Sequence, residues 1–147
     1  MNTADKNYIR HIWVSKKELD IITASLVVFY QEMCWLKKVK NNNLFVKKFE
    51  KSFAFPFIDL EHIERALVEL RNNLENCNKE KICIFFPNNF PNKSLIIYTA
   101  LNECSKNFED YEVSIITGFM KEELDSVLND FKELFPKLEN QQKNLKK

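Results

Sequence analysis

The sequence predicts a helix-rich α/β or α+β domain with about three strands and roughly four to five helices. Two long segments repeat apolar residues at alternating three- and four-residue steps, which is the spacing of one helical face. A short run, Ile82–Phe86, is continuously apolar, as in a buried strand. Hydrophobic residues make up 45% of the chain and charged residues 29%, a balance typical of globular proteins. We expect one globular domain over residues 1–136 and a polar, frayed tail over 137–147.

The first predicted unit is a strand within Tyr8–Val14 followed by a helix over Lys16–Leu36. Ser15 and Glu18 have the spacing of a capping box at the start of this helix. The predicted buried stripe consists of Leu19, Ile22, Leu26, Phe29, Met33 and Leu36, widened by Ile21, Val28 and Trp35.

The next segment, Lys37–Lys51, contains six lysines and one glutamate. It predicts a loop followed by a short, basic, amphipathic helix. Lysines interleaved with Trp35, Phe45 and Phe49 are typical of a surface that binds phosphates and stacks bases. The segment has no arginine, however, and the pI of about 7.6 is far from that of a usual nucleic-acid binder. A nucleic acid is therefore the less favoured partner, and a nucleic-acid-associated regulator is an alternative function.

A second long helix is predicted over Leu60–Cys77. Asp59 has the character of an N-cap, and Ile58 and Ile63 are spaced for a hydrophobic staple. Its three- and four-residue rhythm matches that of the first helix, so we expect the two to pack together on a small sheet.

The carboxy-terminal half begins with the strand Ile82–Phe86, which we expect to be central. A helix starting near Asn92 or Ser94 runs toward Cys104, and a third strand is predicted at Tyr111–Thr117. Gly118 ends that strand. A last helix up to Pro136 carries one apolar face, made of Leu124, Val127, Leu128, Phe131, Leu134 and Phe135.

Two short units share a Glu-Leu-Asp sequence: Glu18-Leu19-Asp20 and Glu123-Leu124-Asp125. Each is predicted to follow a strand and a polar turn. The match is only three residues long, so a chance similarity of two strand-turn-helix units is favoured over an internal duplication.

Residues suited to catalysis or metal binding are few. The single glycine excludes a glycine-rich nucleotide loop, and the two histidines, His11 and His62, have no catalytic setting. The four cysteines form no C-x-x-C pair, which predicts reduced, buried thiols and no metal site. We therefore expect no catalytic, cofactor-binding or metal-binding residues and no enzymatic activity; a small enzyme whose site is unreadable from sequence is the other alternative.

Membrane and export signals are also missing from the sequence pattern. No uninterrupted run approaches the roughly 18 to 20 apolar residues that cross a bilayer. The segment Met1–Arg10 has no apolar signal core. We expect a soluble, cytoplasmic protein with no membrane partner.

Charge is distributed unevenly along the chain. Residues 1–53 contain ten basic and five acidic side chains, whereas residues 101–135 contain nine acidic and three basic ones. Such an uneven charge distribution can steer a charged partner to one end of the molecule. It can also pair two copies of the chain head to tail in a homodimer. Solvated helix faces are the favoured explanation of this distribution.

Two segments carry a family resemblance. Thr99-Ala100-Leu101-Asn102-Glu103-Cys104 is followed by an acidic stretch and then by Ile116-Thr117-Gly118-Phe119-Met120-Lys121-Glu122-Glu123-Leu124. This arrangement, within Tyr98–Phe131, resembles small bacterial immunity proteins of polymorphic or contact-dependent growth inhibition toxins.

The resemblance implies a toxin inhibitor that binds a cognate toxin domain, often a nuclease, by protein–protein interaction and performs no chemistry. One departure is that inhibitors of basic nucleases are usually acidic overall, whereas this chain has 22 basic and 21 acidic residues. The implied toxin-facing region is the acidic carboxy-terminal half. Its candidate partner-binding residues are Glu109, Asp110, Glu112, Glu122 and Asp125.

Overall fold

The computed structural model describes residues 11–40, 42–76, 78–85 and 92–134. It confirms a helix-rich α+β architecture, but within these residues the strands number two and the helices six. The predicted tail over 137–147 lies outside the described residues. The elements in chain order are β1 (His11–Val14), α1 (Lys16–Val39), α2 (Asn42–Phe53), α3 (Phe57–Asn73), β2 (Ile82–Phe85), α4 (Lys93–Lys106), α5 (Val113–Thr117) and α6 (Lys121–Leu134).

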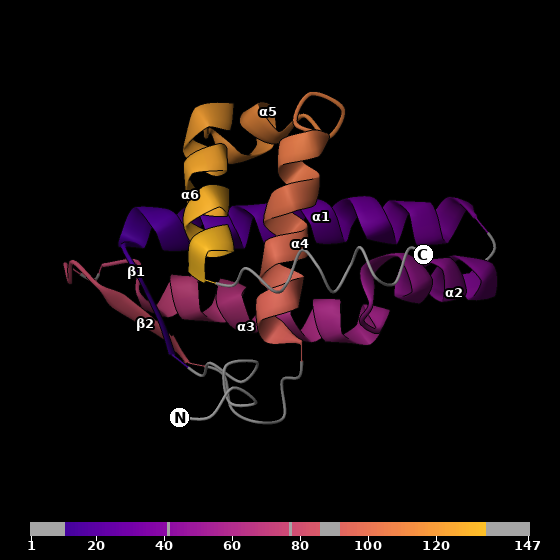
Figure 1. Ribbon diagram of the computed structural model, residues 1–147, viewed down its shortest axis with the longest axis horizontal. Coiled ribbons are helices and arrows are strands. Elements are labelled where there is room, and N and C mark those ends of the chain that lie inside the picture. The colour runs from indigo at the N-terminus through magenta and orange to yellow at the C-terminus, as the bar shows by residue number, and fades with distance from the viewer. Residues whose placement is uncertain (1–10, 41, 77, 86–91, 135–147) are drawn as a thin grey trace.

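Helix α1 is the central element of the fold. It contacts all five other helices, with α2 and α3 running along one side of it and α4 and α6 crossing it (Figure 1). Five positions of its predicted stripe, from Leu19 to Met33, are buried, and Leu36 is half-buried. Trp35 does not belong to this face: its side chain is 59% exposed, so the predicted widening of the apolar face at Trp35 is wrong.

Helix α1 is also long and apolar enough, by length and composition alone, to cross a membrane, although it contains no uninterrupted apolar run of that length. Half of its most apolar window is buried inside the molecule. Its contacts with α3 and α4 supply a packing reason for that composition.

Aromatic rings fill the space between α1, α2 and α3. Phe49 of α2 lies 4.9 Å from Phe53 and 5.2 Å from Phe57, measured between ring centroids, and Phe29 of α1 lies 5.4 Å from Phe53. Tilted and edge-on ring pairs at these distances add to the stabilisation from burial. The short basic helix predicted in this region is confirmed, and its phenylalanines form part of the core.

Helix α3 begins three residues earlier than predicted. Pro56 is its N-cap and makes no side-chain capping bond, while Asp59 lies in the first turn. The extended backbone of proline suits the residue before a helix, so Asp59 is not needed as a cap. Ile58 is exposed, which makes the predicted staple wrong, but the predicted packing of α3 on α1 is confirmed.

The sheet is a two-stranded antiparallel ribbon. Ile12 pairs with Ile84 and Val14 with Ile82, and these four side chains are buried. Trp13 projects from the other face and is exposed. The prediction of a central strand is therefore wrong: β2 has one neighbour among the described residues and turns one face to the core.

The two Glu-Leu-Asp units are both helix starts. The predicted capping box at α1 is confirmed, since the Ser15 N–H donates to Glu18 Oε1 at 2.8 Å and the Glu18 N–H to Ser15 Oγ at 3.1 Å. At α6 the Met120 N–H donates to Glu123 Oε1 at 3.2 Å. The following leucine is buried in both units. Because β1 precedes the first unit and α5 the second, helix capping explains the similarity better than a repeated strand-turn-helix unit.

Candidate protein-binding surface

The acidic residues predicted to face a partner lie mainly in the connection between α4 and α5. Glu109, Asp110 and Glu112 are all exposed there. Backbone hydrogen bonds stabilise this loop. The Tyr111 N–H donates to the Asn107 carbonyl at 2.8 Å, and the Glu112 N–H donates to the Glu109 carbonyl at 3.1 Å. The loop thus holds three carboxylates outward in a defined conformation.

Two aromatic side chains and a valine anchor this loop to the core. Phe108 and Tyr111 are half-buried against it, and burial raises the pKa of Tyr111 to about 12. Val113, the first residue of α5, is buried as well. Anchored aromatic rings at the base of a loop restrict its motion, so the carboxylates are presented from a rigid support.

Helix α5 replaces the third strand predicted at Tyr111–Thr117, and it exposes apolar side chains. Ile115 is 78% exposed, Met120 is 61% exposed, and Ile116 is also exposed. The helix ends at Gly118, whose left-handed φ of 76° allows the chain to turn toward α6. Exposed apolar side chains that form a contiguous patch are typical of a binding surface, and Ile115 and Ile116 are neighbours on α5.

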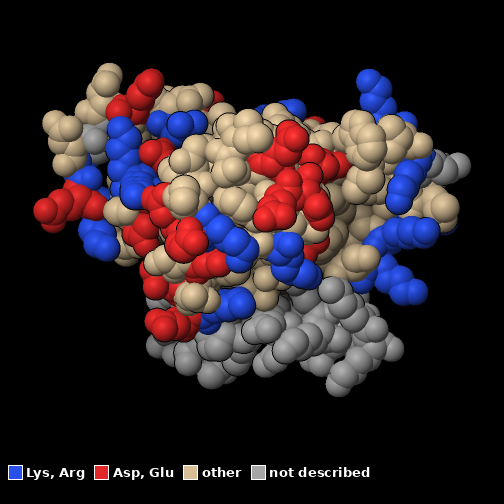
Figure 2. All heavy atoms as spheres, turned by 90° about the horizontal axis from the view of Figure 1, so that it is seen from above, with Lys and Arg blue, Asp and Glu red and all other residues tan. Residues whose placement is uncertain are grey.

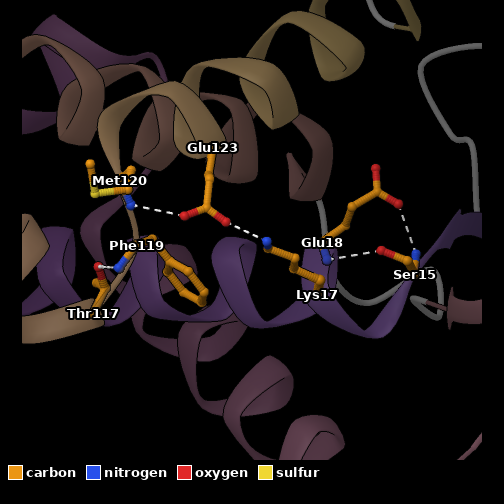
Figure 3. Close-up of polar contacts among 7 residues, drawn as sticks. All are labelled: Ser15, Lys17, Glu18, Thr117, Phe119, Met120 and Glu123. Atoms are coloured by element: carbon orange, nitrogen blue, oxygen red, sulfur yellow. Dashed lines mark hydrogen bonds and ion pairs between the residues drawn. The ribbon is translucent and has the colours of Figure 1, made fainter.

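Polar contacts fix the connection between α5 and α6 against α1. The Lys17 ammonium of α1 pairs with the Glu123 carboxylate, which also accepts the Met120 N–H (Figure 3). Thr117 Oγ1 donates to the Val113 carbonyl at 2.6 Å and accepts the Phe119 N–H at 3.2 Å. These bonds hold the backbone while the Met120 side chain remains exposed.

The two remaining predicted residues belong to α6 and differ in their surroundings. Glu122 is exposed on the first turn, near α5 in sequence. Asp125 is half-buried and accepts hydrogen bonds from Ser105 Oγ of α4 and from Lys121 Nζ, the latter at 2.9 Å. Burial raises its pKa, but these two donors outweigh burial and the net pKa is lowered. Asp125 therefore joins α4 to α6 and is poorly placed to receive a partner.

We define the α5 surface as the exposed side chains around α5 that combine apolar and acidic character. Figure 2 looks onto this end of the molecule and shows Asp and Glu atoms gathered near the middle of the face, beside tan atoms. The α5 surface consists of Glu109, Asp110, Glu112, Ile115, Ile116, Met120 and Glu122. Sequence reasoning found the acids but missed the apolar residues, since a strand at 111–117 would have alternated its side chains between two faces.

The second surface singled out by the sequence is the lysine-rich segment. Phe45 and Phe49 are buried and cannot stack on bases, so that part of the nucleic-acid prediction is wrong. Lys37 lies over the Phe57 ring at 4.9 Å from the centroid. The exposed side chains in and just before this segment are Trp35, Lys38, Val39, Lys40, Asn42, Asn43, Leu44, Lys47, Lys48, Glu50 and Lys51.

The other titratable groups that the structure describes do not form a catalytic or metal-binding cluster. His62 is exposed on α3, and the side chain of His11 lies outside the described residues. Within the described part of the chain, no group of three or more His, Cys, Asp or Glu side chains is arranged to hold a metal ion. Burial raises the pKa of Cys104 to about 12, and burial with the neighbouring Cys34 and Glu61 raises that of Tyr30.

No family model matches this chain, and neither a curated protein nor a solved structure resembles it significantly. The geometry of the described residues alone therefore carries the assignment of surfaces.

Proposed function

We propose that this protein is an immunity-type inhibitor that neutralises a cognate protein toxin by binding it through the α5 surface. The observation that supports this proposal most is the exposure of Ile115, Ile116 and Met120 beside Glu109, Asp110 and Glu112. An apolar centre within a charged rim is the usual anatomy of a protein interface.

The two kinds of side chain have separate roles in such an interface. The apolar side chains lose water on binding and provide most of the affinity. The carboxylates provide charge complementarity, which raises the association rate and selects a basic partner. A nuclease that binds phosphates with lysine and arginine is such a partner, and the carboxylates compete for those groups.

The proposal needs no chemistry from the inhibitor itself. Occupation of the toxin's active site or of a neighbouring exosite is sufficient to exclude the substrate. An inhibitor of this kind would act in the cytoplasm, because that is where a nuclease toxin would meet the DNA or RNA that it cleaves. The near-neutral overall charge is compatible with this function because residues 101–135 carry nine acidic and three basic side chains.

A growth assay tests the proposal. If this chain is an immunity protein, its gene should lie beside that of the toxin, so the protein encoded by the neighbouring gene is expressed from an inducible promoter, with or without this chain. We expect that protein to stop growth and the wild-type chain to restore it, whereas Ile115→Asp fails to do so. Trp13→Asp is a matched control, because Trp13 is equally an exposed apolar residue but lies on β1, and we expect it to restore growth.

The result that would contradict the proposal is growth arrest that the wild-type chain does not relieve, or a neighbouring gene product with no toxicity. Loss of rescue in both variants would show that the α5 surface has no special role.

A further inference from the structure

The end of the molecule where α1 passes into α2 combines exposed apolar side chains with lysines. Residues 33–51 contain six lysines and one acidic residue, the exposed Glu50. Figure 2 shows this end at the right with Lys atoms in blue and no red atoms around them. We call it the basic tip, and it consists of Trp35, Lys38, Val39, Lys40, Leu44, Lys47, Lys48 and Lys51.

The outward stripe of α1 supplies the larger apolar side chains. Trp35 is 59% exposed and Val39 is 56% exposed, and they lie four residues apart on one side of the helix. Lys38 lies between them and is exposed on the same side. A tryptophan and a valine turned to solvent beside a lysine are not explained by the core.

The outward stripe of α2 repeats this composition. Leu44, Lys47, Lys48 and Lys51 follow the three- and four-residue steps of one helical face and are all exposed. In the described part of the chain none of these three lysines, nor Lys38 or Lys40, takes part in an ion pair, so their charge is available to an anionic surface.

The choice of anionic partner follows from which side chains are exposed. Base stacking requires exposed aromatic rings, and two of the three aromatic residues in this segment, Phe45 and Phe49, are buried. The exposed side chains are a tryptophan, a valine and a leucine, and aliphatic groups enter the interfacial layer of a bilayer but do not stack on bases. Tryptophan favours the headgroup level, and lysines are attracted to anionic lipids.

We propose that the basic tip docks this protein peripherally on an anionic lipid bilayer, with Trp35 and Val39 inserted at the headgroup level and the lysines bound to lipid phosphates and carboxylates. The expectation of no membrane partner came from the lack of an uninterrupted spanning run, which does not bear on surface docking. The basic tip and the α5 surface share no residue, so each can be tested without altering the other.

Vesicle sedimentation with a fluorescence reporter tests the docking. The chain has two tryptophans, so Trp13→Phe leaves Trp35 as the one tryptophan, read with excitation at 295 nm to avoid tyrosine emission, and Trp35→Phe leaves Trp13. With vesicles of phosphatidylcholine and phosphatidylserine, we expect binding and a blue shift of emission in Trp13→Phe, and no shift in Trp35→Phe. Vesicles of phosphatidylcholine alone should bind far less of either variant.

Charge variants measure the electrostatic part. Each lysine near an anionic surface contributes about a fivefold change in partition, so Lys47→Gln with Lys51→Gln should weaken binding about 25-fold. Lys79→Gln with Lys81→Gln removes the same charge from exposed positions between α3 and β2, near the opposite end of the molecule, and should change binding little (Figure 1).

Three results would overturn the proposal. The first is no sedimentation with anionic vesicles, or equal sedimentation with neutral ones. The second is an unshifted Trp35 emission despite binding. The third is retention on duplex DNA or RNA in place of vesicles, which would assign the basic tip to nucleic acid.

Discussion

Lys17 in the first turn of α1 forms an ion pair with Glu123 in the first turn of α6, although more than a hundred residues separate them in the chain (Figure 3). The same carboxylate accepts the Met120 N–H, so one side chain caps α6 and joins it to the central helix. Through this contact the α5 surface is fixed to the core.

This contact predicts that acid weakens the fold. The hydrogen bond from Lys17 and then that from Met120 hold the pKa of Glu123 below its ordinary value of 4.5. The unfolded chain therefore binds more protons in that range, and the free energy of unfolding falls as pH drops from about 4.5 through the lower folded pKa. Urea titrations of wild type and Glu123→Gln should show a shallower pH dependence for the variant. Identical slopes would mean that the contact does not form in solution.

Gly118, which caps the carboxy-terminal end of α5, is predicted to be a sensitive backbone position. Its φ is 76°, and a Cβ there would meet nothing within 4 Å, so an added side chain suffers only conformational strain. We expect Gly118→Ala to lower the free energy of unfolding by about 1 to 2 kcal/mol in urea denaturation. Gly118→Asn should cost less, because asparagine tolerates the left-handed region. Equal losses in the two variants would argue against this conformation.

The aromatic cluster gives a prediction about the core. Phe49 is 2% exposed and packs against Phe53, Phe55 and Phe57. Phe49→Ala should lower the free energy of unfolding by about 3 to 5 kcal/mol, because it leaves a cavity. Ile115→Ala is the control, and its high exposure predicts a change within about 0.5 kcal/mol. A small loss for Phe49→Ala would place this residue outside the core.

Cysteine reactivity tests the packing of α4 on α1. Cys104 is fully buried, its Sγ donates to the Ser25 carbonyl at 3.3 Å, and burial raises its thiol pKa to about 12. Because the thiolate is the reactive form, native Cys104 should be alkylated by iodoacetamide far more slowly than half-buried Cys83, as followed by peptide mass spectrometry. In urea both should react alike. Rapid labelling of Cys104 in the native protein would contradict this packing.

Helical periodicity predicted the fold where one face of a segment was continuously apolar. The stripe of α1 from Leu19 to Met33 is buried as expected, and the capping box of Ser15 and Glu18 marked where the helix begins. At α2 the same reasoning was insufficient, because lysines and phenylalanines alternate there and the sequence does not say which side faces α1. The nucleic-acid alternative therefore predicts that Phe49 stacks on bases, whereas the structure buries it.

The α5 surface shows the limit of local propensity. Val113, Ile115, Ile116 and Thr117 favour strands by their branched side chains, yet they form a short helix. Among the described residues the sheet consists of β1 and β2 alone and this segment pairs with neither, while Thr117 Oγ1 donates back to the Val113 carbonyl. Long-range packing decided the outcome, and it also turned Ile115 and Ile116 outward.

The central claim is that the α5 surface binds a toxin, and the dissociation constant of that complex tests it most directly. Calorimetric titration would use the purified toxin domain encoded by the neighbouring gene against wild type, Ile115→Asp and Trp13→Asp. A buried apolar anchor typically contributes about 2 kcal/mol or more, so Ile115→Asp should weaken binding about 30-fold or more while Trp13→Asp leaves it unchanged. Equal affinities for Ile115→Asp and wild type would contradict the account.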